Sequence, residues 1–316
     1  MIKKFKLIIV VLIFAAAIWG VFEKSKNKPS DDIAQYTRGS KNIECLYYNE
    51  TDFINIPVYK TNNKMGTIRG CIVPHHLVAK NLIHEVFQNA VKNNYSTIVL
   101  MGPDHESTDK GKIFTTLKDW QTPSGILKTD TATTSKLTRS GLVTENNDKL
   151  TLEHSTSSII PFISYYFKDS QNMDSQNVTR DVNSQNSTRD INVVTLVLTK
   201  QVKLSDIDKL TELLFECIDI NETLFIASVD FSHYLNIENA ENMDFISMEA
   251  IKNEDFYRIM SFTNDNMDSP VSISAMLKMM KEAGANDKTV LNRSNSEYIL
   301  QKKIDETTSY ITYLFN

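Results

Sequence analysis

Three histidines of this chain share one local pattern, because each closely follows a mostly apolar run of five or six residues. The run 68–73 precedes His75, the run 97–101 precedes His105, and the run 224–229 precedes His233. Such short runs, bounded by Pro, Gly or Asp, are typical of buried strands. Ligands of parallel sheets bind at the edge where the carboxyl ends of the strands meet. The pattern therefore predicts that these three imidazoles face one crevice.

Histidines gathered at such an edge indicate metal chemistry. Neutral imidazole is the commonest side-chain ligand for zinc, iron and copper. Two histidines and one carboxylate form the facial set of non-haem iron sites, which leaves positions open for substrate. Carboxylates next to the histidines in the sequence can hold the second ring nitrogens; they are Asp104, Glu153 and Asp230. The sequence thus predicts one transition-metal site.

The other histidines allow more than one interpretation. His76 either supports the site or is only a sequence neighbour of it. His84 lies inside a predicted helix and is interpreted as structural or exposed. The segment 153–155, Glu-His-Ser, opens another predicted helix, so it either caps that helix or brings His154 into the site.

Strand and helix signals alternate along the segments that must position these residues. Besides the three runs above, two segments have strand patterns: 193–198 and 309–315. Helical patterns lie between the strands: 82–90, 155–167, 207–218 and two or three helices between 237 and 282. Strands that are apolar throughout, with helices between them, indicate a parallel sheet covered on both faces. We therefore expect an α/β fold in one domain, with a mainly parallel central sheet and helices on both faces.

The first 28 residues have the composition of an export signal. Three lysines precede the uninterrupted apolar run 7–22, and a lysine-rich polar segment follows it. A positively charged start and an apolar stretch are typical of signal peptides. We expect residues 1–28 to be a signal-anchor with a transmembrane helix, or a cleaved signal peptide, and residues 29–42 to be a linker. This predicts a cell-membrane protein with a single span and an extracytoplasmic domain, or a secreted protein if the segment is cleaved.

Residues 169–192 form a second segment of unusual composition. Ser-Gln-Asn occurs there three times and Thr-Arg-Asp twice. A segment with so few apolar residues has little surface to bury, so it does not add to a packed core. We interpret it as a low-complexity insertion within a domain that spans residues 43–316.

Composition and motifs exclude several classes of function. The net charge of −5, without a basic patch interleaved with aromatic residues, argues against a nucleic-acid partner. The three cysteines have no C-x-x-C spacing, which argues against a disulfide framework or a zinc knuckle. The chain contains no dinucleotide-binding, Walker, H-E-x-x-H or G-x-S-x-G motif. A serine hydrolase and a P-loop enzyme are therefore not indicated.

Four sequence blocks, in this order, resemble the Memo family, also called AmmeMemoRadiSam system protein B. They are Ile72-Val73-Pro74-His75, Leu100-Met101-Gly102-Pro103-Asp104-His105, Glu153-His154-Ser155 with Pro161-Phe162, and Ala227-Ser228-Val229-Asp230-Phe231-Ser232-His233-Tyr234. The resemblance covers roughly residues 43–316. It implies a fold similar to that of class III extradiol dioxygenases, which use non-haem iron(II), so iron(II) is the favoured metal here, with zinc or copper as alternatives.

The resemblance also assigns roles to single residues. His75 and His105 correspond to metal ligands of the family. His233 corresponds to its active-site histidine, with Asp230 as the acidic neighbour.

Two departures from the family pattern affect the site. The third ligand is a cysteine in characterised Memo proteins and a glutamate in the dioxygenases. The matching stretch here is 266–270, Asn-Met-Asp-Ser-Pro, which has no cysteine, so Asp268 is the expected carboxylate ligand. The glycine and tyrosines that follow the first family histidine are also absent, so the resemblance does not imply a substrate.

Three functions are compatible with these residues. The first is a redox enzyme with iron(II) bound by the two histidines and the carboxylate, and with His233 as acid and base. The second is a metal-dependent hydrolase that uses a metal-bound water, with His233 or Glu153 as the base. The third is a non-catalytic protein that binds a metal or a protein partner. We expect a small-molecule substrate in a pocket at the strand ends, with catalytic roles for His233, Asp230, Glu153 and His154.

Overall fold

The computed structural model of the protein describes residues 40–316, except 62–64, 107–110 and 169–190. The chain divides into two units, residues 1–40 and 41–316, and all the described helices and strands lie in the second. The predicted segment 1–28 and most of the predicted linker 29–42 lie outside the described residues. So do residues 169–190 of the predicted insertion, whereas residue 192 already belongs to a strand.

The prediction of a membrane protein needs correction. Among the described residues, no helix is long and apolar enough to cross a membrane. A spanning helix needs about 20 apolar residues, and the longest described helix, α9 (Ile237–Lys252), has 16 residues and carries charged side chains. This finding contradicts the predicted signal-anchor with its transmembrane helix, the membrane as a partner, and the placement in the cell membrane with a single span. The apolar run 7–22 that prompted these predictions is also shorter than a usual span.

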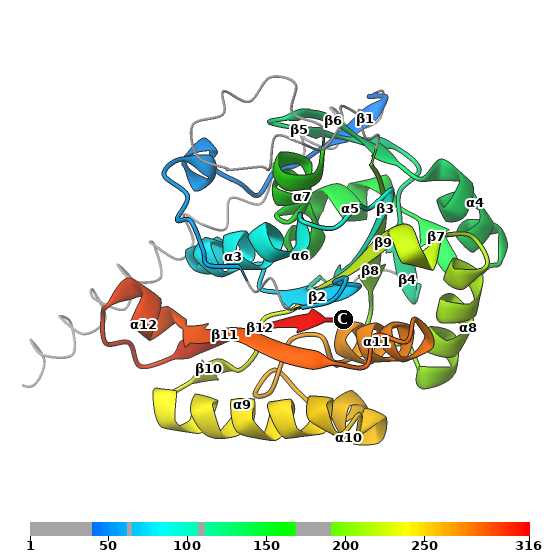
Figure 1. Cartoon of the computed structure of the whole chain (residues 1–316). Coiled ribbons are helices and arrows are strands. Elements are labelled where there is room, and N and C mark those ends of the chain that lie inside the picture. Colours follow the sequence, from blue (N-terminus) through cyan, green and yellow to red (C-terminus); the bar gives the residue numbers. More distant parts are fainter. Residues whose placement is uncertain (1–39, 62–64, 107–110, 169–190) are drawn as a thin grey trace, which may run out of the picture. The chain divides into compact units, whose positions relative to one another are not determined.

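Within the described residues, twelve strands form one mixed sheet (Figure 1). Its centre consists of five neighbouring strands that run parallel to one another. In spatial order they are β6 (Gly125–Thr129), β8 (Asn192–Leu198), β3 (Thr97–Pro103), β9 (Thr223–Ser228) and β2 (Gly70–Val73).

Further strands, most of them antiparallel, extend this centre. Beyond β2, strand β12 (Thr307–Phe315) runs antiparallel to it and also pairs with β10 (His233–Leu235) and β11 (Lys288–Asn295). Beyond β6 lie β5 (Asp119–Thr122) and β1 (Asn42–Glu44). Beside the end of β8, β4 (Ile113–Thr115) pairs with β8 and with β7 (Val143–Glu145).

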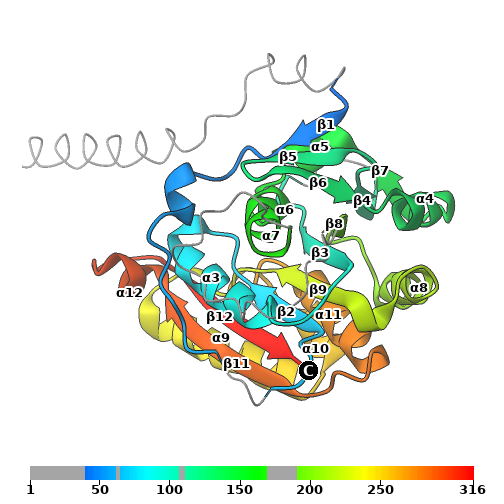
Figure 2. The ribbon, with the colours of Figure 1, turned by 45° about the horizontal axis from the view of Figure 1, so that its top comes forward.

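Helices cover both faces of the sheet (Figures 1 and 2). One face packs against α3 (Lys80–Ala90), α5 (Asn147–Leu152) and α7 (Ile160–Phe167). The other packs against α4 (Thr131–Arg139), α8 (Leu204–Phe215), α9, α10 (Phe256–Met260) and α11 (Pro270–Glu282). The short helix α12 (Ser296–Leu300) contacts the 3-10 turn η2 (Leu77–Ala79). Two further 3-10 turns are η1 (Glu50–Phe53) and η3 (Ile220–Glu222).

The central strands contribute to both cores because successive side chains point to opposite faces. In β3, Ile98 and Leu100 belong to the core beneath α3 and α7, whereas Val99 and Met101 belong to the core beneath α8 and α11. This double burial explains why the strands are apolar throughout. The predicted α/β fold, with a mainly parallel sheet covered on both faces, is confirmed.

Two parts of the fold differ from the prediction. The single helix predicted over 155–167 is two helices, α6 (His154–Ser157) and α7, and Pro161 lies in the first turn of α7. Proline is tolerated there because the first N–H groups of a helix have no partner within it. The stretch between β3 and α6, interpreted as a loop region, contains four short strands and two helices.

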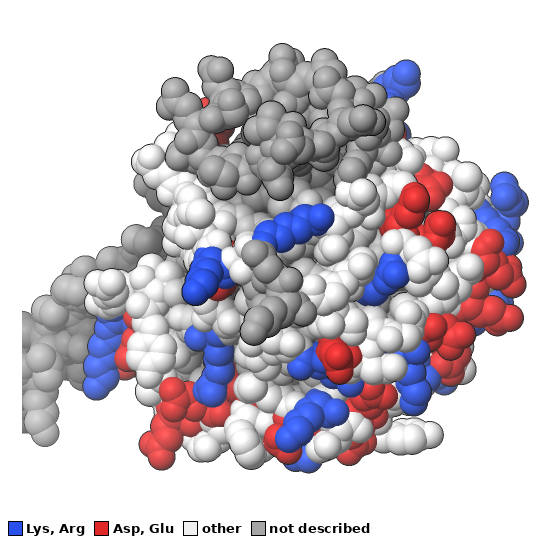
Figure 3. All heavy atoms as spheres, in the orientation of Figure 1, with Lys and Arg blue, Asp and Glu red and all other residues white. Residues whose placement is uncertain are grey.

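The surface of the helical layer formed by α8, α10 and α11 carries charges of both signs. Figure 3 shows Lys and Arg side chains next to Asp and Glu over this part of the molecule. Several of them form ion pairs, such as Lys278 with Asp208 at 2.5 Å. Exposed pairs of this kind contribute little to stability, typically below about 1 kcal/mol. We interpret this face as an ordinary solvated surface.

Candidate metal centre

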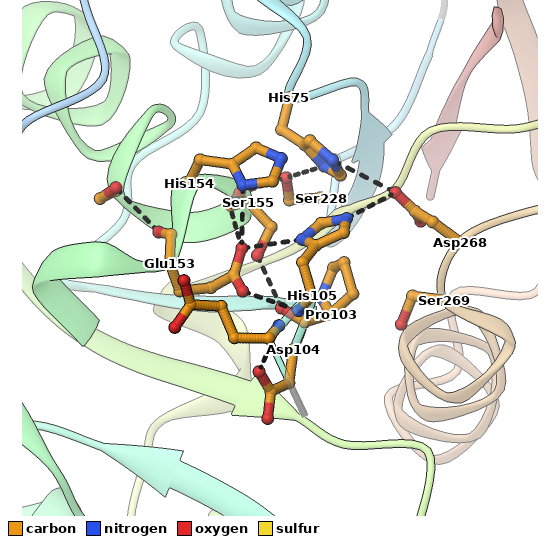
Figure 4. A network of polar contacts seen from close by, with 12 residues as sticks. His75, Pro103, Asp104, His105, Glu153, His154, Ser155, Ser228, Asp268 and Ser269 are labelled. Carbon is orange, nitrogen blue, oxygen red and sulfur yellow. Dashed lines mark hydrogen bonds and ion pairs between the residues drawn. The ribbon is translucent and has the colours of Figure 1, made fainter. Parts of the chain in front are cut away.

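The carboxyl ends of β2, β3 and β9 lie at one edge of the parallel sheet, and each is followed by a chemically active side chain. His75 lies two residues after the end of β2, His105 two residues after β3, and Asp230 two residues after β9. Figure 4 shows the rings of His75 and His105 next to the carboxylate of Asp268. The fold therefore brings together residues that are far apart in the sequence.

The tautomer of His75 follows from its neighbour Ser228. The Ser228 hydroxyl donates its hydrogen to the carbonyl oxygen of Ser155 at 2.6 Å, so its oxygen accepts from His75 Nδ1 at 3.2 Å. With the proton on Nδ1, the Nε2 atom of neutral His75 carries the lone pair. This Nε2 lies 3.2 Å from Asp268 Oδ2 and 3.5 Å from Asp230 Oδ2.

The tautomer of His105 is fixed by the buried carboxylate of Glu153. His105 donates to Glu153 from Nδ1 at 2.9 Å and from its backbone N–H at 2.8 Å. Burial raises the pKa of Glu153, but the hydrogen bonds and charge of His105 lower it to about 2, so the group is a carboxylate. The lone pair of neutral His105 is therefore on Nε2, which lies 3.6 Å from Asp268 Oδ2.

Asp268 is held in place by backbone contacts with the segment that follows β9. Its N–H donates to the carbonyl oxygen of Asp230 at 3.1 Å, and Met267 forms a bridge with Phe231. Ser269, the next residue, caps the N-terminus of α11. Asp268 is buried, and within the described part of the chain its Oδ1 has no hydrogen-bond partner.

A cation is needed where the two imidazole nitrogens face this carboxylate, because a nitrogen lone pair and a carboxylate oxygen repel each other. Burial lowers the pKa of His105, but its hydrogen bonds to Asp268 and Glu153 raise it to about 10, which shows how strongly positive charge is favoured. A metal ion also fits this position. Nitrogen and oxygen ligands about 2.1 Å from one ion lie about 3.0–3.4 Å apart, and the distances here are 3.2 and 3.6 Å.

Two groups of side chains in the described structure are able to hold a metal ion. One consists of His75, His105 and His154, and the other of His75, Asp230 and Asp268. Within each group, one ligand atom from every residue lies within 4.8 Å of the others. The two groups share His75, so they describe one centre rather than two distant ones.

Similarity to known proteins agrees with these residues. A family model described as "Memo-like protein" matches residues 47–314. The chain belongs to the Memo family. This confirms the resemblance carried by the four sequence blocks. No curated protein matches this Memo-family chain. Among solved structures, it is similar to an uncharacterized protein from Escherichia coli K12, with 11% identity, coverage of 77% of this chain and 98% of that chain, and a TM-score of 0.45.

In this Memo-family protein, His154 lies directly beside the two histidines of the candidate metal centre. Its ring stacks on that of His105 with 4.2 Å between centroids, and it lies 5.2 Å from the ring of His75. Burial and the charges of these two histidines lower the pKa of His154 to about 3. It is therefore a neutral imidazole with a lone pair available to a metal.

His233 lies next to His76. The two rings are 6.4 Å apart, and His233 Nδ1 is buried without a hydrogen-bond partner in the described structure. Burial lowers the pKa of His233, although the charges of Asp268 and Asp230 oppose this effect. His76 is half exposed, and its Nδ1 lies 3.4 Å from the hydroxyl of Tyr310. Neither Tyr310 nor Ser228 was recognised in the sequence; the only signal for Ser228 is a polar residue in an apolar strand.

Asp104 was predicted to hold a histidine ring, whereas His84 was interpreted as structural or exposed. Asp104 does not hold a histidine, since its carboxylate binds the buried amine of Lys149 at 2.9 and 3.0 Å. His84 lies away from the centre, where its Nδ1 contacts the Tyr166 hydroxyl at 2.8 Å and its Nε2 donates to the carbonyl oxygen of Asp52 at 2.9 Å. A surface hollow of about 620 Å³ between α8, α10 and α11 is lined by none of the centre's residues.

Proposed function

We propose that this Memo-family protein is a non-haem metal enzyme, with iron(II) bound by His75, His105 and Asp268 and a small molecule as substrate. One observation supports this most directly. The Nε2 lone pairs of both histidines, each set by a hydrogen bond at Nδ1, face the same oxygen of Asp268. Two imidazoles and one carboxylate are the donor set of non-haem iron(II) oxygenases, with positions left open for substrate and O₂.

Iron(II), when bound, would supply the positions at which substrate and O₂ meet and exchange electrons. The chain supplies the surroundings. Glu153 holds His105 and raises its basicity as a ligand. Burial favours neutral His233, and its Nδ1 has no hydrogen-bond partner among the described residues, so it is the group best prepared to accept a substrate proton. The side chains of His76, His105 and His154 are 49%, 30% and 35% exposed, and we place the substrate's entry on this open side.

A second candidate function is a zinc hydrolase. His75, His105 and His154 form a group of three imidazoles, the ligand set of catalytic zinc sites that activate water. His233 would again serve as the base. The two candidates differ in one ligand, because the redox centre requires Asp268 and the hydrolase requires His154.

The metal content of the purified wild type and its variants distinguishes the iron enzyme from the zinc hydrolase. The wild type and the variants H105A, D268A and H154A are purified without oxygen and measured by elemental analysis. We expect about one iron per chain in the wild type, loss of the metal in H105A and D268A, and retention in H154A. H84Q serves as the matched control, since it removes a histidine that lies away from the centre.

Three results would contradict the proposal. Zinc that is lost in H154A but kept in D268A would favour the hydrolase. A wild type without metal after reconstitution with iron(II) and zinc(II) would exclude both enzymes. Full metal binding without turnover of any catechol, ester or phosphoester would leave the metal- or partner-binding protein as the function.

A further inference from the structure

One oxygen of the Asp230 carboxylate faces two imidazole nitrogens: Oδ2 lies 3.5 Å from His75 Nε2 and 3.4 Å from His76 Nδ1. Asp230 is fully buried, and its Oδ1 accepts the backbone N–H of His75 at 3.1 Å. Its Oδ2 has no hydrogen-bond partner among the described residues. A buried carboxylate oxygen without a partner costs free energy, so native structures usually pair it with a donor or a cation.

The position of this oxygen points to a cation. Asp230 Oδ2 lies 3.5 Å from His75 Nε2, close to the 3.2 Å between the same nitrogen and Asp268 Oδ2. In its neutral form His75 has no hydrogen on Nε2, because the Ser228 hydroxyl holds the ring proton on Nδ1. One ion bound to His75 Nε2 is therefore within reach of both carboxylates, which with His75 form one of the two ligand groups.

We propose that Asp230 is a fourth metal ligand, bound through Oδ2 from the buried side of the centre. This inference rests on the proposed function, in which His75, His105 and Asp268 hold the ion. Two carboxylates then balance the two positive charges of a divalent ion. Four nitrogen and oxygen donors without a thiolate suit iron(II) or manganese(II), and they disfavour copper(I), which prefers soft sulfur ligands.

The variant Asp230→Asn tests whether Asp230 is a metal ligand or only positions His75. The asparagine oxygen still accepts the His75 backbone N–H, whereas its amide nitrogen cannot bind the ion. Loss of a group outside the ligand set typically weakens metal binding by about 10- to 100-fold. We therefore expect D230N to weaken manganese(II) binding, measured by competition with a chelator, by more than about 100-fold. D244N is the matched control, since Asp244 is equally buried, binds the Ser232 hydroxyl at 2.8 Å and belongs to neither ligand group; its affinity should equal that of the wild type.

A crystal structure of the manganese-loaded wild type provides a test that does not depend on the variant's folding. We expect the ion about 2.0–2.2 Å from Asp230 Oδ2, a normal distance for a bound carboxylate. A separation above about 3 Å, or an affinity loss in D230N below about 100-fold, would overturn the proposal. If the wild type binds no metal at all, the proposed function fails first and the inference falls with it.

Discussion

Glu153 accepts two hydrogen bonds from one residue, His105: one from the ring Nδ1 and one from the backbone N–H. It also accepts the backbone N–H of Ser155 at 2.8 Å, at the start of α6. The same carboxylate thus fixes the loop after β3, the orientation of the imidazole and the first turn of a helix. Glu153, predicted to be catalytic, is better described as the residue that positions His105.

Replacing Glu153 by glutamine should weaken metal binding about 10- to 100-fold, the usual effect of losing a partner behind a metal-bound histidine. Glutamine has only one side-chain oxygen, so it cannot accept the ring N–H and the backbone N–H of His105 on two separate oxygens, as Glu153 does. The ring then loses its fixed orientation. Isothermal titration with zinc(II) measures the change. E145Q, at an exposed position, is the control; an unchanged affinity in E153Q would show that His105 does not bind the ion.

Gly102 makes the packing of β3 against α6 possible. A Cβ at this position would lie 2.7 Å from Ser155 Oγ, and that hydroxyl is already held by the carbonyl oxygen of Pro103 at 2.8 Å. Overpacking of a tight core typically costs about 1–3 kcal/mol. We expect G102A to lower the free energy of unfolding by this amount in urea titrations. G66A is the control, because its Cβ meets only Asn316 Nδ2 at 3.7 Å; equal stability of the two variants would refute the packing argument.

Lys149 and Asp104 form a buried ion pair directly next to His105, with side chains 5% and 0% exposed. Removing one partner of such a pair typically costs about 3–5 kcal/mol, because the other charge stays buried. We expect K149M to show a loss of this size in chemical denaturation. The double variant K149M/D104L should recover much of it, since replacement of both charges is often neutral. A K149M protein as stable as the wild type would mean that water already reaches Asp104.

His84 should make stability depend on pH. Burial lowers the pKa of His84, and the hydrogen bond to the Asp52 carbonyl offsets this only in part. Below about pH 6.5, the ordinary value, the unfolded chain binds a proton that the folded chain does not, so the free energy of unfolding falls as the pH falls. We expect this fall between about pH 7 and pH 5 to be steeper in the wild type than in H84Q. If the free energy of unfolding had the same pH dependence in the wild type and in H84Q, His84 would have the same pKa in the folded and unfolded states.

The sequence predicted the sheet and the strand-end histidines because both depend on local patterns. Apolar runs mark doubly buried strands, and the carboxyl ends of parallel strands share an edge. Asp268 was found only through the family resemblance. Its position depends on the pairing of Met267 with Phe231, a contact between distant segments that no local pattern shows.

The unpredicted elements are those with a weak apolar pattern. Strands β4, β5 and β7 have three or four residues each, too few for alternation to be recognised. The stacking of His154 on His105 was not predicted, because it depends on the break between α6 and α7. The membrane prediction rested on one short apolar run, which lies outside the described residues.

The proposed metal ligands are dispersed along the chain, and this has a thermodynamic consequence. His75, His105, Asp230 and Asp268 come together only when β2, β3, β9 and the segment before α11 are in place. An unfolded chain therefore offers the ion no comparable set of ligands, and the ion binds the folded state almost exclusively. At a free metal concentration 100 times the dissociation constant, such binding adds about 2.7 kcal/mol to the free energy of unfolding. If the chain binds metal as proposed, the metal supply would set how much folded protein a cell keeps.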